Sequence, residues 1–171
     1  LFEQMNAVAF QAHPYRRPII GWMSDLETMT AADARTWYDT WYVPNNATLV
    51  IAGDVDHQEV FAQAEKFYGP LEGRPLPVRR PQTEPIQEGI RHLTVKAPAE
   101  LPVLLMGYKA PVLRDVAKDS DPYALEMLGA VLDGHAAARF GKKLVREDKV
   151  AVAAGVEYDS SARGPGMFYL H

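Results

Sequence analysis

The chain has 171 residues and no cysteine, with 47% hydrophobic and 23% charged residues, which is the balance of an ordinary globular protein. Its net charge of -4 gives no general attraction to phosphate backbones or anionic lipid, so nucleic-acid and membrane-surface partners are not expected. No apolar stretch approaches the roughly 18 residues of a membrane-spanning helix. The lack of cysteine excludes thiolate catalysis, cysteine-ligated zinc and disulfides, but the compartment stays open between cytoplasm and periplasm.

The two ends of the sequence have no features of a natural start or stop. Leu1-Phe2-Glu3-Gln4 contains neither an initiator methionine nor the start of a signal peptide. The sequence ends at His171, inside a predicted strand. We therefore expect a piece of a longer protein. Its length allows one sizeable core or two small ones.

The first half of the sequence predicts two amphipathic helices with a strand between them. Thr30 with Asp33 is a capping signal for a helix over 31–42, whose aromatic face we expect to be buried. Asp56 caps a second helix that runs to about residue 68 and again has one apolar face. The β-branched run 47–52 predicts a strand covered on both faces.

A proline-rich segment follows between Gly69 and Gly89. Each proline removes an amide donor and fixes φ, so we expect a linker without regular structure. The prolines are Pro70, Pro75, Pro77, Pro81 and Pro85. The arginines of this segment are either a phosphate or carboxylate patch or, as we prefer, a solvated linker surface. They are Arg74, Arg79 and Arg80.

The second half of the sequence predicts a mixture of strands and helices. Strand candidates lie over 90–96 and 101–109, and Pro102 marks the start of the second. Asp121 before Pro122 predicts the start of a helix that ends at Gly134. Its expected buried stripe is Ala124, Leu125, Leu128, Val131 and Leu132. The remaining elements are a helix over 137–147, a strand over 150–158, a loop over 159–166 and a strand over 167–170.

The search for local catalytic motifs is negative. No histidine has a second histidine within five positions, so neither His-Glu-x-x-His nor its inverted form occurs. The histidines are His13, His57, His92, His135 and His171. The motif Gly-x-Ser-x-Gly and a phosphate-binding loop are also missing. The segment Gly164-Pro165-Gly166 predicts a turn. We therefore assign no catalytic residue and no metal ligand.

Two residue groups have both a functional and a structural interpretation. Asp54 and Asp56 could pair their carboxylates or hold a cation, but one follows a strand-ending glycine and the other caps a helix. The tryptophans could form an aromatic ligand box, but two of them lie on the helix face expected in the core. They are Trp22, Trp37 and Trp41. We prefer the structural interpretation for both groups.

The order of the motifs is more informative than any one of them. One string runs from His13-Pro-Tyr-Arg-Arg to Gly21-Trp22, and a second starts at Trp41-Tyr-Val-Pro-Asn-Asn and continues to Gly53-Asp-Val. Together they strongly resemble the insulinase/pitrilysin family of zinc metallopeptidases, which includes the mitochondrial processing peptidases. The segment 132–147, which ends in Leu-Val-Arg-Glu, looks like the family's second repeat. The resemblance covers roughly residues 12–158. After Glu147 the chain lacks the glycine and tyrosine that relatives often have.

The resemblance implies an α+β fold made of parts of two homologous repeats. In the family, each repeat has a mostly antiparallel sheet with helices on one face, and a linker joins the repeats. It implies that residues 1–71 are the C-terminal part of a first repeat, 72–87 the linker, and 88–171 the N-terminal part of a second.

The resemblance also implies where the chemistry lies. Family members hold zinc with the two histidines of an inverted His-x-x-Glu-His motif and a later glutamate, and the motif glutamate activates water. All of these would lie upstream of Leu1, and Glu3 is too late to be the ligand. Zinc is therefore expected in the parent protein and not in this chain, whose substrate-binding residues stay unidentified.

Two functions of different class follow from the resemblance. The first is a non-catalytic, inactive domain region of a zinc endopeptidase that helps enclose an extended peptide, bound by strand addition, and needs the upstream zinc domain for hydrolysis. The alternative is a scaffold or partner subunit whose parent has lost zinc catalysis. The expected partners are a peptide or protein substrate and a catalytic domain, in the same chain or a partner subunit, and a homodimer stays open. A free-standing enzyme is the least supported interpretation.

Overall fold

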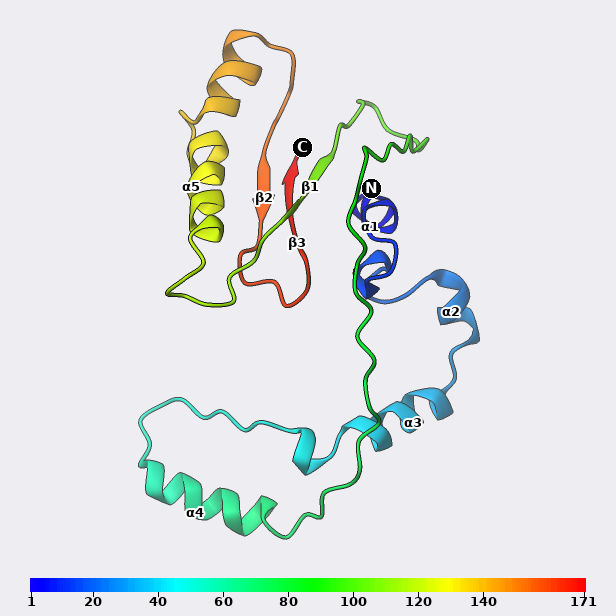
Figure 1. The fold of residues 1–171 in the computed structure, drawn as a ribbon, viewed down its shortest axis with the longest axis vertical. Helices are drawn as coiled ribbons and strands as arrows, with labels where there is room; N and C mark the ends of the chain where they lie inside the picture. The colour runs from blue at the N-terminus through cyan, green and yellow to red at the C-terminus, as the bar shows by residue number, and fades with distance from the viewer. The chain divides into compact units, whose positions relative to one another are not determined.

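A computed structural model describes residues 1–171, which divide into two units. Unit 1 contains Leu1–Ile19 and Thr83–His171, and unit 2 contains Ile20–Gln82. Figure 1 traces the chain through both units, with unit 2 in blue to green. No helix in the structure is both long and apolar enough to span a bilayer.

Unit 1 is built on a three-stranded antiparallel sheet. Its strands are β1 (Met106–Ala110), β2 (Val156–Tyr158) and β3 (Gly166–Leu170), in the order β1-β3-β2. β3 is therefore central, and β1 and β2 are the two edges. Phe168 of β3 lies opposite Tyr108 on one side and Tyr158 on the other. This confirms the antiparallel sheet that we expected.

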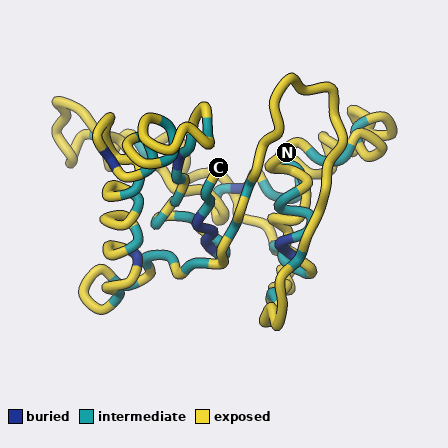
Figure 2. The backbone as a smooth tube through the Cα atoms, turned by 90° about the horizontal axis from the view of Figure 1, so that it is seen from above, coloured by how far each residue is buried: buried dark blue, intermediate teal, exposed yellow.

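A helix lies against each face of this sheet. Side chains alternate between the faces of a strand, so Phe168 shares a face with Tyr158, while Met167 and Tyr169 share the other. Helix α5 (Asp121–Asp133) covers the first face, and α1 (Phe2–Ala9) covers the second (Figure 2). The sequence patterns did not predict α1, and the arrangement of helices within each repeat stays a prediction.

The small core of unit 1 lies on the α1 side of the sheet. Phe10 and Ala9 at the end of α1 pack against Met167 of β3, with Tyr169 beside them. Phe10 is only 2% exposed. The nearby Gly107 of β1 has no room for a side chain, because a Cβ there would collide with Met5 and Met167. Close packing of α1 on the sheet therefore needs glycine at this position.

The helical elements in the second half of unit 1 differ from the expected pattern in their details. α5 begins at Asp121 with Pro122 in its first turn, but the N-cap is Ser120 and no side chain caps the helix. The predicted helix over 137–147 is the π-helix η3 (Gly141–Glu147), after a short turn. The helix ends at Glu147, and Lys149, two residues later, has a left-handed φ of 53°.

The buried stripe of α5 is also rotated relative to the prediction. Leu125, Gly129 and Leu132 are partly buried, and Pro122 is buried. Leu128 and Val131, which we expected in the core, are exposed. The reason is that Gly129 faces Val156 of β2, where a Cβ would lie 3.6 Å from the valine Cγ1, so the sheet selects a different side of the helix.

Several predicted strands of unit 1 are shorter or missing. Segment 90–96 forms no strand, β1 starts at Met106 and not at Pro102, and β2 starts at Val156 and not at residue 150. A strand needs a neighbour that accepts its hydrogen bonds. β3 has only five residues, so it can pair only short stretches on either side. The predicted loop over 159–166 and the last strand are confirmed to within one residue.

Unit 2 consists of helices without a sheet. They are α2 (Met23–Thr28), α3 (Ala31–Trp41), the 3₁₀-helix η2 (Pro44–Asn46) and α4 (His57–Tyr68). Thr30 and Asp33 form the predicted capping box of α3, in which each side chain bonds to the other's backbone. Asp56 accepts hydrogen bonds from the amides of Gln58 and Glu59 at the start of α4. Both capping predictions are confirmed.

Burial in unit 2 does not follow the prediction. The expected strand over 47–52 is absent, and Val50 in it is 82% exposed. The aromatic face of α3 is also open, since Trp37 is 61% exposed, and Phe61 and Phe67 of α4 are exposed in the same way. Without a paired strand, unit 2 has no sheet face on which these helices could pack.

The proline-rich segment 69–89 contains no helix or strand, as its composition predicts. Its first part pairs within unit 2, where the Asn45 side chain bonds to both the amide and the carbonyl of Arg74. Its end belongs to unit 1, which starts again at Thr83. The division into repeats at 71 and 88 stays a prediction.

Candidate functional site

The candidate site lies beside the edge strand β2. Gly155 and His171 exchange both backbone hydrogen bonds, at 2.7 Å and 3.0 Å, and extend the β2–β3 ladder by one pair. In an antiparallel ladder such pairs alternate with pairs that make no bonds to each other. Glu157 therefore bonds to Tyr169, whereas the amides and carbonyls of Val156 and Tyr158 point away from β3. No other backbone group of the chain bonds to them.

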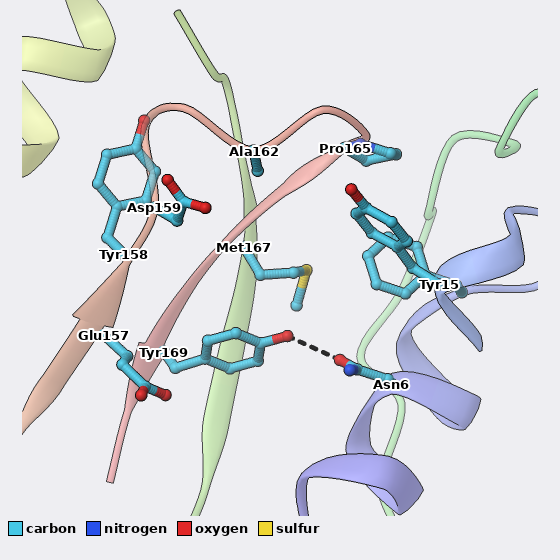
Figure 3. A pocket seen from close by; sticks show the side chains of 10 residues that line it. Asn6, Tyr15, Glu157, Tyr158, Asp159, Ala162, Pro165, Met167 and Tyr169 are labelled. Carbon is cyan, nitrogen blue, oxygen red and sulfur yellow. Dashed lines mark hydrogen bonds between the residues drawn. The ribbon is translucent and has the colours of Figure 1, made fainter. Parts of the chain in front are cut away.

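A cavity of about 290 Å³ opens on the α1 face next to this edge (Figure 3). It lies between α1 with the following 3₁₀-helix η1 (Pro14–Arg16) and the β2–β3 hairpin. Figure 3 shows Tyr15 on the η1 side and Glu157 and Asp159 on the β2 side, with Met167 and Tyr169 between them. The remaining lining residues are Asn6, Phe10, Tyr158, Ala162 and Pro165.

The aromatic wall of the cavity is held by hydrogen bonds and ring contacts. Tyr169 bonds through its hydroxyl to Asn6 Oδ1 at 2.7 Å, and the Gly164 amide donates to the Tyr15 hydroxyl at 2.9 Å. The Phe10 and Tyr15 rings meet edge to face, 6.1 Å apart. Burial, and then the charge of Glu157, raises the pKa of Tyr169. The Tyr169 phenol therefore stays neutral at physiological pH.

The acidic wall has no cation of its own. Neither Glu157 nor Asp159 takes part in an ion pair. The Asp159 Oδ1 accepts hydrogen bonds from the amide and hydroxyl of Ser161, at 2.9 Å and 2.7 Å, and these bonds lower the pKa of the carboxyl group. Its other oxygen and the whole Glu157 carboxylate have no hydrogen-bond partner. The β2 side of the cavity therefore carries two uncompensated negative charges.

Glu84 fixes the backbone that carries Tyr15. Its carboxylate accepts hydrogen bonds from the amides of Gln11, Ala12 and His13, at 2.9–3.0 Å, and forms an ion pair with Lys109 at 2.9 Å. The carboxylate is 8% exposed. Burial raises its pKa, but the three amides and the lysine outweigh burial and lower it to about 2. Glu84 thus ties β1 to the chain between α1 and η1.

The residues of this chain do not fit a zinc ion. No group of three or more histidine, aspartate or glutamate side chains is placed to hold a metal. His13 accepts a hydrogen bond from the Tyr15 amide at 3.2 Å, and His135 accepts one from the Ala137 amide at 3.1 Å, so both have local capping roles. Asp56 is the α4 cap already described, and Asp54 is exposed and makes no hydrogen bond. We assign no hydrolytic step to these residues.

The other groups singled out in the sequence are not brought into one site. No ring contact joins Trp22, Trp37 and Trp41. The expected core role of Trp37 is wrong, because no sheet covers α3. The Arg79 guanidinium lies over the indole of Trp41, with its Cζ 4.2 Å from the centre of the Trp41 ring. This arginine therefore stabilises unit 2 by a cation–π contact and is not wholly solvated.

No pattern in the sequence singles out the cavity residues. They come from three segments, around 6–15, 157–165 and 167–169, which only the folded sheet brings together. Glu84 was missed because the amides that it binds lie 71–73 residues away. One signal was available: Glu157 and Asp159 are two residues apart at the end of a predicted strand, so strand alternation puts both on one face.

Comparison with known proteins gives consistent matches. The sequence profile described as "Peptidase M16 inactive domain" matches residues 28–171. "Zinc protease PqqE" of Helicobacter pylori is 30% identical over 160 residues, which are 90% of this chain and 34% of that protein. The "Probable mitochondrial-processing peptidase subunit beta" of Schizosaccharomyces pombe is 32% identical over 42% of this chain and 16% of its own length.

The fold is shared with a solved structure. A crystal structure of a protease from Helicobacter pylori superposes with a TM-score of 0.84 and 27% identity, over 99% of this chain and 41% of that one. The chain thus spans between about a sixth and two fifths of the length of these relatives.

Proposed function

The chain belongs to the peptidase M16 inactive-domain family, and from this we propose that it is a non-catalytic region of a zinc endopeptidase that binds an extended peptide. Hydrolysis would then require zinc and its ligands from a catalytic region, in the same polypeptide or in a partner subunit. The names of the relatives support the protease part of the proposal. The description of the matching profile as an inactive domain supports the non-catalytic part.

The free edge of β2 is the observation that carries peptide binding. Val156 and Tyr158 each direct an amide and a carbonyl away from the sheet, so a peptide strand laid beside β2 can satisfy four backbone groups. Strand addition of this kind draws its affinity from backbone pairing and tolerates many sequences. A protease domain that must hold varied peptides in extended form needs such a surface.

A binding experiment with two peptides tests the proposal. A fluorescein-labelled peptide rich in valine and threonine is titrated with the full chain, and its anisotropy is compared with that of the same peptide N-methylated at alternate residues. N-methylation removes the amide donors on one edge and keeps the side chains. We expect it to weaken binding by about tenfold or more, since each lost backbone bond contributes about 0.5–1.5 kcal/mol.

The same samples test the non-catalytic role. The labelled peptide should remain intact after incubation with the chain and added zinc. Equal affinity for the two peptides would contradict strand addition, and zinc-dependent cleavage by the chain alone would contradict the non-catalytic role.

The gene sequence upstream of Leu1 separates the two kinds of parent. An intact His-x-x-Glu-His motif with a later glutamate would make this chain part of an active zinc peptidase. A degenerate motif would favour the scaffold or partner subunit, for which activity appears only when a catalytic partner is added. The word "subunit" in the name of the Schizosaccharomyces relative is the observation that keeps this second candidate.

A further inference from the structure

We propose that residues 84–91 form a strap that holds helix α1 on the sheet and releases it as one unit. The strap is held at its two ends by charged side chains, Glu84 and Arg91, and is free between them. Glu84 is the second residue of unit 1 after the chain returns from unit 2. This device is independent of peptide binding at β2, and it determines which part of unit 1 opens first.

Helix α1 is too short to be stable by itself. It has eight residues, whereas isolated helices shorter than about 12–15 residues are marginal in water. No side chain caps its first turn, and its last turn contains no basic residue that would complement the negative end of the helix dipole. Its position therefore depends on contacts from outside the helix.

Arg91 supplies the missing cation at the C-terminal end of α1. Its Nη1 donates to the carbonyls of Val8 and Ala9, at 2.8 Å and 2.9 Å. The last carbonyls of a helix have no partner within the helix, so a donor from elsewhere in the chain satisfies them. Because Arg91 lies 82–83 residues further along the chain, this cap exists only while the strap is in place.

Glu84 holds the next residues from the other end of the strap. Its carboxylate accepts hydrogen bonds from the amides of residues 11–13, and its ion pair with Lys109 connects the strap to β1. Phe10, which is 2% exposed, lies between the carbonyls held by Arg91 and the amides held by Glu84. The two ends of the strap therefore hold the backbone on both sides of the side chain that anchors α1 in the core.

The middle of the strap makes no hydrogen bond to the rest of the chain. Residues 85–90 form no helix or strand, and Ile86 and Ile90 are 91% and 94% exposed. The one hydrogen bond in this part runs within it, from Gln87 Nε2 to the Gly89 carbonyl at 2.7 Å. Since only the two ends are fixed, the release of one end frees the segment that leads to the other.

Release of the strap has a defined consequence for the sheet. Ala9 and Phe10 pack on Met167 of β3, with Tyr169 beside them. When α1 leaves, this face loses its cover, whereas the pairing of β3 with β1 and β2 stays intact. The structure thus predicts a local opening of α1 that occurs without unfolding of the sheet.

Hydrogen exchange of the full chain with alanine at either end tests the strap. In Glu84→Ala and in Arg91→Ala, we expect the amides of α1 to exchange about tenfold faster or more, because hydrogen bonds to charged groups are the strong ones. The Tyr169 amide, which bonds to Glu157 in the middle of the sheet, should exchange at the parent rate. Equal acceleration of α1 and Tyr169 would mean that the sheet unfolds together with the helix, and would overturn the proposal.

The effect across the strap distinguishes one device from two separate contacts. Arg91→Ala should accelerate exchange of the amides of residues 11–13, which bond only to Glu84. The double variant should accelerate exchange in α1 by less than the product of the two single factors. Parent rates at residues 11–13 in Arg91→Ala, or single effects that simply multiply, would show independent contacts and overturn the strap.

Acetate gives a second readout, which general destabilisation does not produce. Glu84→Ala removes a carboxylate and leaves room for acetate beside Lys109 and the amides of residues 11–13. Acetate in large excess should restore most of the lost protection in Glu84→Ala and none in Arg91→Ala. Chloride at the same concentration should restore none in either variant. Failure of acetate to restore protection in Glu84→Ala would contradict the role given to this carboxylate.

Glu88→Ala and Arg80→Ala are matched controls. Glu88 lies in the exposed middle of the strap and Arg80 lies outside it, and neither makes an ion pair or a side-chain hydrogen bond. Both variants should exchange like the parent. If an alanine variant at Glu84 or Arg91 does not fold, Glu84→Gln and Arg91→Lys keep a hydrogen-bonding group at each end and should give smaller accelerations of the same kind. Parent rates in α1 for both of these variants would overturn the proposal.

Discussion

The two units use the same local signals but reach different degrees of burial. Unit 1 pairs three strands and buries Phe10, Met167 and Phe168. Unit 2 has better-defined helix caps than unit 1, with a full capping box at Thr30, yet Val43 is its only buried apolar residue. The buried positions in Figure 2 accordingly gather on the strands and on the elements of unit 1.

The difference shows which part of folding is local. A capping box and a 3.6-residue period suffice to set a helix, because the bonds lie within one turn. Burial needs a second surface, and only unit 1 has a sheet to supply it. Helix α3 has the sequence pattern of an amphipathic helix, but its aromatic face stays exposed because unit 2 has no sheet to cover it.

Truncating one buried ring in unit 1 should have the largest effect on this comparison. Phe10→Ala removes a side chain that is 2% exposed and packs on Ala9 and Met167, so we expect unit 1 to lose about 3–5 kcal/mol. Hydrogen exchange of the β3 amides measures the loss. Phe61→Ala in unit 2, where the ring is 65% exposed, should change stability by no more than about 0.5 kcal/mol. Equal effects of the two variants would contradict the difference in burial.

Acid should destabilise unit 1 through Glu84. Its pKa is lowered to about 2 in the folded chain from 4.5, so its contribution is fully present above pH 4.5 and is lost as the pH falls toward 2. The contribution is about 3 kcal/mol, at about 1.4 kcal/mol for each pKa unit. Urea unfolding of unit 1 at pH 6, 4 and 2.5 measures it. A stability that rises as the pH falls would contradict this sign.

Glu84→Gln should remove most of this pH dependence. At pH 7 it replaces a charged acceptor of three amides and a lysine, and we expect a loss of about 1.5–3 kcal/mol in unit 1. Glu88→Gln is the control, since Glu88 is an exposed neighbour without an ion pair. A Glu84→Gln variant as stable as this control would show that the Glu84 contacts are not formed in solution.

Removing a cap should affect unit 2 alone. Asp56→Ala leaves the amides of Gln58 and Glu59 without their acceptor, and we expect α4 to lose about 0.5–2 kcal/mol. Circular dichroism and exchange of the α4 amides measure the loss. Asp56→Asn, which keeps a capping oxygen, should lose much less. Faster hydrogen exchange of the β3 amides in Asp56→Ala would contradict an effect confined to unit 2.

The smallest expected change is a gain. Lys149 has a φ of 53°, a conformation that costs a non-glycine residue about 1–2 kcal/mol. Lys149→Gly relieves this cost but makes the unfolded chain more flexible, so we expect a net stabilisation below about 1 kcal/mol. Thermal unfolding measures it against Lys149→Ala, which should give no gain. A clear destabilisation by glycine would contradict the left-handed backbone.

Part of the fold was predictable from short-range pattern. Thr30, Asp33 and Asp56 form the bonds that their spacing predicts, and β3 and its preceding loop lie where alternation and the turn residues place them. The run over 47–52 has the composition of a strand but no partner, and composition cannot supply one.

The site was less predictable than the fold. Glu84 looks like any charged residue of a proline-rich linker, and only the folded chain brings it to the amides of residues 11–13. Glu157 and Asp159 become a wall only because α1, which no pattern predicted, covers the same face of the sheet. Long-range contacts of this kind leave no local signature.

The most direct test of peptide binding at β2 is amide hydrogen exchange with and without a saturating valine- and threonine-rich peptide. The account predicts that exchange slows at Val156 and Tyr158, whose amides point away from β3, and changes little at Glu157, which already bonds to Tyr169. Unchanged exchange at Val156 and Tyr158 while the peptide is bound would contradict it. Protection at Gly107 and Lys109 instead would place the peptide on the β1 edge.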